Sequence, residues 1–401
     1  MTNWKKIYLS FFLSIFLIGV FTSCNKNNKT EQMKIVHTQL PTAGLSADLQ
    51  KGVSAAYAAL LDGKLIVAGG CNFPDKPPYE GGAKIYYDEI LMIDTLNPQA
   101  WSVIGKLPEA AAYGVSVQLD NSALWIGGNG ASKSYNDVYR VSLDNDTVVL
   151  DALPQLPAAF DNFAGCAVNN LVFVGGGNES GKASNSVYTI RLDQDSVWTK
   201  LPDFPGEPRV QPVMAALEID GNEYLYLLGG IFGGDADRKP MVATDVLRYS
   251  VAGSSWEKVA GQFDPISQRP FSLGGATAMA IENRYILAIG GVNYDIFLDA
   301  LASIHKNTFD KTISDNERKE RAKAFSLNYM TQPIDYYKFN KEYRLFDTET
   351  NIWSTLDVSE NGARAGATLL PDGRTFYAVQ GELKPGVRTP ETWKGEIKSL
   401  E

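Results

Sequence analysis

A pair of glycines recurs after short apolar runs along the chain, and this repeat restricts the possible folds more than any other feature. Two of the apolar runs contain an Asp-Gly dipeptide, at Asp62-Gly63 and Asp220-Gly221, which is typical of a tight β-hairpin. Units of roughly 50 to 60 residues with one hairpin each predict an array of small sheets. The glycine pairs are Gly69-Gly70, Gly127-Gly128, Gly175-Gly176, Gly229-Gly230 and Gly290-Gly291.

A sixth, altered copy of the unit lies near the C-terminus. Residues 366–379 repeat the hairpin, and the glycine pair is replaced by Gln380-Gly381. The run from Trp393 to Leu400 predicts the third strand of this unit, which leaves the unit one strand short. Residues 35–40 form an unassigned β-like run at the other end of the chain. We expect this run to supply the missing strand, because such closure leaves no sheet edge exposed.

An aromatic strand and then a tryptophan follow most glycine pairs. This pattern resembles Kelch repeats over nearly the whole chain, and it implies an all-β fold, a six-bladed Kelch-type β-propeller over residues 34–401. The aromatic residues are Tyr139, Tyr188, Tyr249 and Tyr343, and the tryptophans are Trp101, Trp198, Trp256 and Trp353.

Residues 295–340 break the β pattern inside the fifth blade. Leu298, Leu301 and Ile304 have helical spacing, and a charged run follows from Asp315 to Lys323. We therefore predict a short helical insertion after the second strand of that blade. The alternative interpretation is a solvated decoration, because charged helical runs usually face solvent. The sequence leaves open whether the insertion closes over a ligand as a lid.

The N-terminal residues have the layout of a targeting segment. Lys5 and Lys6 precede an apolar run that is short for a membrane span, and small residues precede Cys24. The segment resembles a bacterial lipoprotein signal, which implies cleavage after residue 23 and lipidation of Cys24. Residues 24–33 then form a polar tether, and the protein is expected in the periplasm, lipid-anchored to a membrane. The alternative is an uncleaved N-terminal anchor.

Charge and composition argue against several kinds of partner and site. The net charge of -9 disfavours nucleic acid, which needs a basic surface. Two histidines, His37 and His305, are too few for a His-rich metal site, so no metal is expected. Cys71 and Cys166 fall on blades that are not adjacent, and we expect two small buried thiols rather than a disulfide.

The loops that follow second strands and those that enter first strands lie on one face of a propeller, where a site is expected. The residues that follow the six glycine pairs are Cys71, Asn129, Gly177, Ile231, Val292 and Glu382. Only the sixth position carries a carboxylate. Arg388 comes six residues later, after a Pro-Gly turn that would return it toward Glu382. The two side chains are candidates for an acid–base and anion-binding pair, and the alternative is an ion pair that braces the loop.

Four other residues on the same face are candidates for substrate binding. Each has an ordinary structural alternative. Arg209 would otherwise brace a junction between blades, and Tyr113 would be a core aromatic. Asn293 would cap its own turn, and Lys84 would be solvated.

The string from Gly381 to Thr389, Gly-Glu-Leu-Lys-Pro-Gly-Val-Arg-Thr, resembles the signature of the N-acetylneuraminate epimerase family, also called sialic acid mutarotases. Residues 112–116, 204–211, 290–297 and 335–340 are similar to other stretches of that family. The resemblance implies a periplasmic isomerase without a cofactor, which converts α-N-acetylneuraminate to the β-anomer during sialic acid utilisation. It also implies that Glu382 is the proton acceptor and Arg388 its essential partner. The motif lies near the C-terminus here and mid-chain in familiar members, so the order of blades resembles a cyclically permuted branch.

Two other functions fit a propeller of this kind. A non-catalytic Kelch propeller would bind a glycan or a protein without changing it. A sialidase-like glycoside hydrolase would carry repeated Ser-x-Asp-x-Gly-x-Thr-Trp turns, which the sequence lacks. The sequence therefore favours an epimerase that takes a small sugar acid as its partner, with Glu382 and Arg388 at the centre of its active site.

Overall fold

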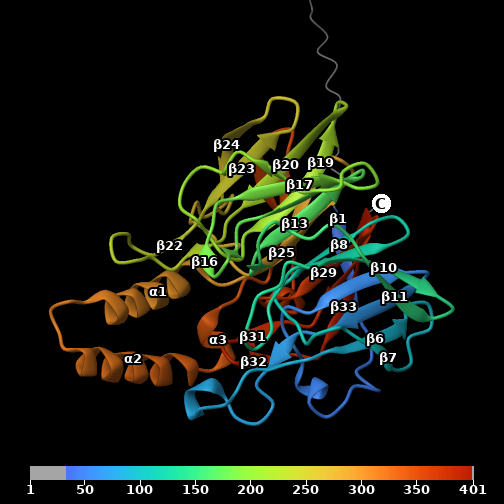
Figure 1. Cartoon of the computed structure of the whole chain (residues 1–401). Coiled ribbons are helices and arrows are strands. Elements are labelled where there is room, and N and C mark those ends of the chain that lie inside the picture. The colour runs from blue at the N-terminus through green and yellow to red at the C-terminus, as the bar shows by residue number, and fades with distance from the viewer. Residues whose placement is uncertain (1–32, 400–401) are drawn as a thin grey trace, which may run out of the picture.

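The computed structural model describes residues 33–399 and consists mainly of antiparallel sheets (Figure 1). The nearly all-β architecture expected from the repeats is confirmed. The expected signal peptide, Cys24 and almost all of the tether lie outside the described residues. No helix within residues 33–399 is long and apolar enough to cross a membrane.

Six sheets of four strands each, called blades one to six, form the body of the described chain. Blade one contains β2 (Tyr57–Leu61), β3 (Lys64–Ala68), β6 (Glu89–Asp94) and β7 (Ser102–Lys106). Blade two contains β8 (Val115–Gln118), β9 (Ala123–Ile126), β10 (Val138–Asp144) and β11 (Thr147–Ala152). Blade three contains β13 (Ala164–Val168), β14 (Leu171–Gly175), β17 (Val187–Arg191) and β18 (Thr199–Leu201). Blade four contains β19 (Val213–Ile219), β20 (Asn222–Leu228), β23 (Asp245–Ser250) and β24 (Ser255–Gly261). Blade five contains β25 (Ala276–Ile281), β26 (Tyr285–Gly290), β27 (Glu342–Asp347) and β28 (Ile352–Val358). Blade six contains β29 (Thr368–Asp372), β30 (Thr375–Val379), β33 (Thr392–Ser399) and β1 (Met33–Gln39).

A closed circle of backbone hydrogen bonds joins the six blades at one face. In every blade, a residue that lies just before the innermost strand donates its backbone N–H to the carbonyl oxygen of the equivalent residue in the preceding blade, over 2.7 to 3.3 Å. All six have positive φ, and they are Ala55, Tyr113, Asn162, Gln211, Gly275 and Gly366, called the axial ring. The innermost strands also contact one another in the same cyclic order. The blades therefore surround one axis, as in a β-propeller.

The repeated tryptophans connect neighbouring blades. Trp198, Trp256 and Trp353 are on blades three, four and five, and each indole N–H donates to a backbone carbonyl at the outer edge of the preceding blade. Trp101 of blade one donates in the same way to Pro41, which directly follows the blade-six strand β1. A buried indole needs an acceptor for its N–H, so the tryptophan both fills space and orients the next sheet.

Strand β1 completes blade six from the opposite end of the described chain. It pairs antiparallel with β33, from Met33 opposite Ser399 to Gln39 opposite Trp393. The C-terminal end lies beside β1 in Figure 1. The run expected at residues 35–40 thus occurs as β1 at Met33–Gln39, and Ile35 is buried between blades five and six. This pairing covers the sheet edge that β33 would otherwise expose.

The glycine pair of blade three lies one residue later than the sequence analysis placed it. Gly176 and Gly177 have φ of 64° and 71°, whereas Gly175 is the last residue of β14. Because residues 175–177 are all glycine, the sequence did not show which two of them form the pair. The residue that follows the pair in blade three is therefore Asn178 and not Gly177, and Asn178 pairs with Asp161. Glu382 remains the only carboxylate among the six equivalent positions.

Four small sheets extend the blades on the face of the axial ring. They are β4 (Cys71–Asn72) with β5 (Ile85–Tyr86); β12 (Phe160–Asp161) with β15 (Asn178–Glu179) and β16 (Lys182–Ala183); β21 (Ile231–Phe232) with β22 (Met241–Val242); and β31 (Glu382–Lys384) with β32 (Val387–Arg388). Cys71 in β4 and Cys166 in β13 are free thiols in different blades.

The helices gather on the same face, between β26 and β27 in sequence (Figure 1). Helix α1 (Tyr294–Phe309) packs against β22 of blade four, and Leu301 is buried against Ile231 and Val242. Helix α2 (Asp315–Met330) has no buried residue and reaches the 3₁₀ turn η2 (Pro78–Glu80) of blade one. The insertion thus extends from blade five toward blades four and one, over the hairpin that holds Glu382. The helical elements are α1 (Tyr294–Phe309), α2 (Asp315–Met330), α3 (Ile334–Tyr337) and the 3₁₀ turns η1 (Leu49–Lys51), η2 (Pro78–Glu80) and η3 (Glu360–Gly362).

Candidate active site

Glu382 and Arg388 face each other across the short β31–β32 hairpin. The Pro385-Gly386 turn places them in register, and Nη2 of Arg388 lies 2.9 Å from Oε2 of Glu382. The backbone N–H of Gly386 donates to Oε1 of Glu382 over 3.3 Å. Burial raises the pKa of the Glu382 carboxyl group, while Arg388, this N–H and Lys84 act in the opposite direction. A half-buried carboxyl group with a raised pKa is suited to exchange protons near neutral pH.

The Arg388 guanidinium is almost fully buried, with a side-chain exposure of 3%. Its Nε donates to Oγ of Ser54 over 3.1 Å, and its Cζ lies 5.2 Å from the centre of the Phe73 ring. Within residues 33–399, Nη1 of Arg388 has no hydrogen-bond partner. A buried donor without a partner is costly, so this N–H is available to an anionic ligand.

Lys84 and Tyr113 form a second polar pair beside the first. The ammonium group of Lys84 donates to the Tyr113 hydroxyl over 3.3 Å and lies 5.9 Å from the centre of the Phe73 ring. Burial raises the pKa of Tyr113, which therefore stays protonated and keeps a proton to donate. Arg388 and Glu382 both influence this pKa, so the two pairs lie within electrostatic range of each other. The structure thus brings together four of the expected site residues.

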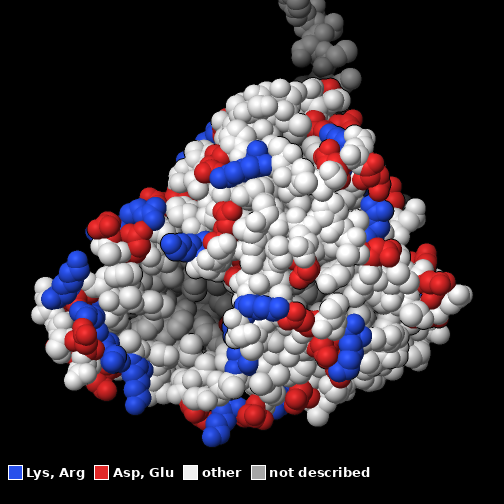
Figure 2. Space-filling view, viewed as in Figure 1, with Lys and Arg blue, Asp and Glu red and all other residues white. Residues whose placement is uncertain are grey.

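The helical insertion contributes an aromatic group to the same region. The Glu382 carboxylate helps to raise the pKa of Tyr329 and of Tyr337, the latter to about 12, although burial is the larger cause for both. Lys384 of the hairpin donates to the carbonyl oxygens of Met330 and Gln332 at the end of α2, over 3.2 and 2.6 Å. Figure 2 shows a hollow on this face, between the insertion and the blades.

Arg209 and Asn293, also expected to bind substrate, are engaged in structural contacts. The Arg209 side chain is 1% exposed and binds both carboxylate oxygens of Asp245. Asn293 caps helix α1 by accepting a hydrogen bond from the N–H of Ile296 over 3.1 Å. Within residues 33–399, no hydrogen bond or ion pair joins either residue to Glu382 or Arg388. The observed contacts are those of the structural alternatives, namely a structural ion pair for Arg209 and a cap for Asn293.

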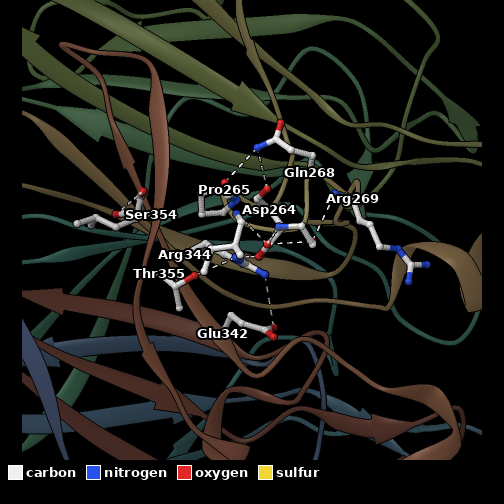
Figure 3. A network of polar contacts seen from close by, with 11 residues as sticks. Asp264, Pro265, Gln268, Arg269, Glu342, Arg344, Ser354 and Thr355 are labelled. Carbon is white, nitrogen blue, oxygen red and sulfur yellow. Dashed lines mark hydrogen bonds and ion pairs between the residues drawn. The ribbon is translucent and has the colours of Figure 1, made fainter.

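A groove of about 890 Å³ runs along blade five and the insertion, and Leu383 is among the residues that line it. The arginines of this groove are already neutralised. Arg344 donates to Asp264 over 2.7 Å and to Thr355 over 2.9 Å, as Figure 3 shows. Arg269 pairs with Asp295 at 2.5 Å. Within residues 33–399, neither Arg344 nor Arg269 has a buried N–H without a hydrogen-bond partner, whereas Arg388 has one at Nη1.

Several residues of the site were not predicted from the sequence. Ser54 and Phe73 contact Arg388, but a serine before a strand and a phenylalanine in a loop carry no signal of their own. Tyr329 and Tyr337 come from an insertion that was expected only to be helical. Lys384 belongs to the signature string, and its contact with α2 was not foreseen. Within residues 33–399, no group of three or more His, Cys, Asp or Glu side chains gathers as a metal site would require.

Comparisons with known proteins place the chain among relatives of one family. The family profile described as N-acetylneuraminate epimerase matches residues 19–150 and 153–401. N-acetylneuraminate epimerase 1 of Escherichia coli O6:H1 (strain CFT073) is 29% identical over 251 residues, which cover 63% of this chain and 61% of that protein. The N-acetylneuraminate epimerase of Yersinia enterocolitica is 30% identical over 252 residues, which cover 62% and 58%.

The solved structure of YjhT is similar in fold, with a TM-score of 0.51 and 27% identity over 62% of this chain and 67% of that one. The match to each curated relative spans about 60% of that relative's length. The family profile extends much further and reaches both the Glu382 hairpin and the axial ring. The chain therefore belongs to the N-acetylneuraminate epimerase family.

Proposed function

We propose that the protein is an isomerase that interconverts the α- and β-anomers of N-acetylneuraminate, with Glu382 as its proton acceptor. The observation that carries this proposal is the half-buried Glu382 carboxyl group paired with a buried Arg388 whose Nη1 has no hydrogen-bond partner among residues 33–399. The names of the family and of its curated members support the choice of sugar acid.

The proposed reaction needs only proton transfers. The Glu382 carboxylate removes the proton from the anomeric hydroxyl, the anomeric carbon becomes a ketone, and its bond to the ring oxygen breaks. The ring oxygen receives a proton from the same carboxyl group through a positioned water. Rotation about the adjacent carbon–carbon bond presents the other face of the ketone, and the reverse steps close the ring. No bond or electron is gained or lost overall.

Arg388 has two tasks in this scheme. Its Nη2 holds Glu382 in place, and its free Nη1 binds the carboxylate that sialic acid carries on its anomeric carbon. The Phe73 ring lies within cation–π distance of the guanidinium and helps to hold it in place. Tyr113, held by Lys84, supplies a further hydrogen-bond donor beside the same group.

The decisive experiment is proton NMR of freshly released α-N-acetylneuraminate with the purified full chain. We expect faster equilibration of the α and β signals than without protein, and a loss of at least about a hundredfold in Glu382→Gln. A variant that kept full activity would remove Glu382 from this role. Saturable binding without any acceleration would instead favour a non-catalytic glycan-binding propeller.

We also propose that the blades are Kelch repeats in a cyclically permuted order. The signature hairpin belongs to the last blade, and β1 completes that blade from the other end of the described chain. A closed ring tolerates such permutation because its first and last strands meet in one blade. The incomplete match to the curated relatives agrees with a changed order, because a collinear alignment cannot follow both halves.

Lipidation of Cys24 and anchoring to a membrane in the periplasm complete the proposal. The basic, apolar and small-residue segments before Cys24 support it. Replacement Cys24→Ser is expected to move the protein from the membrane fraction to the soluble periplasmic fraction. Retention of this variant in the membrane would favour an uncleaved N-terminal anchor.

A further inference from the structure

The six blades present very different side chains to the axis at equivalent positions. Blade six, which holds Glu382, has Gly366 at its axial-ring position and Ala365 directly before it. Blade five is equally bare, with Gly274 and Gly275. In a ring of six, blade three lies directly opposite blade six. There Asp161 and Asn162 occupy these two positions, and Asn178 occupies the position equivalent to Glu382. Polar side chains are thus concentrated across the axis from the candidate acid–base pair.

Asp161 is the centre of this polar group. Its side chain is buried, and its Oδ1 accepts hydrogen bonds from the amides of Asn162 and Asn178 over 2.8 and 2.7 Å. Its Oδ2 accepts from the hydroxyl of Ser134 over 2.5 Å. A carboxylate accepts about four hydrogen bonds, so these three leave room for one more donor.

The neighbouring blades continue the group with amides. Gln211 of blade four donates to Oδ1 of Asn162 over 3.0 Å. Asn129 of blade two has a buried Oδ1 without a hydrogen-bond partner within residues 33–399. Within residues 33–399, Oε1 of Gln211 and Oδ1 of Asn178 likewise accept no hydrogen bond. Three amide oxygens and one carboxylate position are therefore free, and none of them carries a positive charge that would attract an anion.

The axial ring determines where two of these polar side chains lie. Asn162 and Gln211 occupy axial-ring positions, whose positive φ is common to all six ring residues, and there they carry polar side chains. The two half-exposed side chains are held there in one connected chain of hydrogen bonds. We call Asp161, Asn162, Asn178, Asn129 and Gln211 the polar arc. On the opposite side of the ring, Gly275 and Gly366 carry no side chain, which leaves that side open beside Glu382.

The polar arc and the acid–base pair both adjoin the axial ring. Tyr113, whose hydroxyl accepts a hydrogen bond from Lys84, also accepts one at its backbone carbonyl oxygen from the N–H of Asn162 over 2.9 Å. On the other side, Ala365 directly precedes the ring residue Gly366 and pairs with Glu382. The two groups therefore border the same ring of six residues around the axis.

We propose that Asn129, Asn178 and Gln211, arranged around Asp161, bind the neutral polar part of the sugar acid, namely its hydroxyl and acetamido groups. Free amide oxygens and a buried carboxylate accept hydrogen bonds from O–H and N–H donors. The charged end of the ligand would then lie at Arg388 and its neutral end across the axis at blade three. This inference rests on the proposed sugar-acid substrate and adds a residue-level basis for its selection.

The test is saturation-transfer NMR with β-N-acetylneuraminate as the probe, on the wild type, Asn178→Ala and Gln211→Ala. Asn170→Ala, in the β13–β14 turn at the other end of blade three, is the matched control. We expect strong saturation of the N-acetyl methyl and side-chain protons in the wild type and the control. In the two variants this saturation falls, and the KM for anomerisation rises about three- to tenfold at nearly unchanged kcat.

The outcomes separate this inference from the proposed function. Binding with the expected saturation pattern but without anomerisation would remove the enzymatic proposal and keep the polar arc. Anomerisation with wild-type KM and saturation in both folded variants would overturn the arc and keep the enzyme. Absence of any binding would overturn both. A melting temperature for each variant within a few degrees of the wild type shows that the fold is intact.

Discussion

At the scale of single residues, the protonation of Glu382 is set by opposing contributions. Burial disfavours the charged carboxylate and dominates, so the pKa lies above its usual value near 4.5. Arg388, the N–H of Gly386 and Lys84 favour the carboxylate and limit the shift. Because the proposed reaction begins with the carboxylate, the catalysed rate should fall as the pH is lowered through this raised pKa.

The variant Lys84→Met tests this electrostatic balance. Removing the ammonium group takes away one contribution that favours the carboxylate, so the pKa of Glu382 rises further. The acidic limb of the profile of kcat/KM against pH is therefore expected to move to higher pH. Lys76→Met, which removes an exposed lysine of the same loop, is the control and should leave the limb in place. A shift toward lower pH in Lys84→Met would contradict the assignment of Glu382 as the base.

The glycine pairs show at single positions what a sequence can and cannot reveal. The first residue of each pair has φ between 51° and 76°, and Gln380 occupies this position in blade six. The second has φ between 71° and 113° and is glycine in every blade. Residues other than glycine visit the first conformation at a modest cost, which explains why the sixth copy remained recognisable despite its altered pair.

At the scale of elements, the β31–β32 hairpin is held from two sides. Its strands pair with each other, and Lys384 binds the carbonyl oxygens at the C-terminal end of α2, where the helix dipole favours a cation. Because Lys384 is two residues from Glu382, the insertion helps to position the carboxyl group. Lys384 is thus a positioning residue in our proposal and not a catalytic one.

The variant Lys384→Met is expected to lower kcat by about ten- to a hundredfold, because small displacements of a catalytic group are costly. The expected changes in melting temperature and in the pH profile are small. Lys384→Arg keeps a donor at this position and should restore most of the activity. Lys319→Met, on the exposed part of α2, is the control. A large loss of stability without a selective loss of kcat would show that the contact is merely structural.

The elements also show where prediction from sequence ended. Hairpins, Asp-Gly turns and the signature string are local patterns, so the strands and the Glu382–Arg388 hairpin were predictable. Three glycines from 175 to 177 hid the register of blade three, and with it the pairing of Asn178 with Asp161. The contacts of Phe73 with Arg388 and of Lys384 with α2 join distant segments, and no local pattern encodes them.

At the scale of the whole molecule, ring closure decides both stability and function. The axial ring fixes which blades are opposite each other, so the position of Glu382 across from blade three depends on every blade between them. Closure itself depends on β1, whose seven residues pair with the last described strand. Damage to this pairing should therefore weaken the entire ring rather than one blade.

Two neighbouring residues of β1 allow a matched test of this dependence. Ile35 is 7% exposed and packs between blades five and six, whereas Val36 on the other face of the strand is 37% exposed. Ile35→Ala is expected to lower the free energy of unfolding by about 2–5 kcal/mol, and Val36→Ala by about 0.5 kcal/mol or less. Denaturant titration followed by circular dichroism and by tryptophan fluorescence measures both. If closure couples the blades, the two probes report one shared transition that shifts as a unit in Ile35→Ala. A separate early transition confined to part of the signal would show that blade six unfolds alone and that the ring is not cooperative.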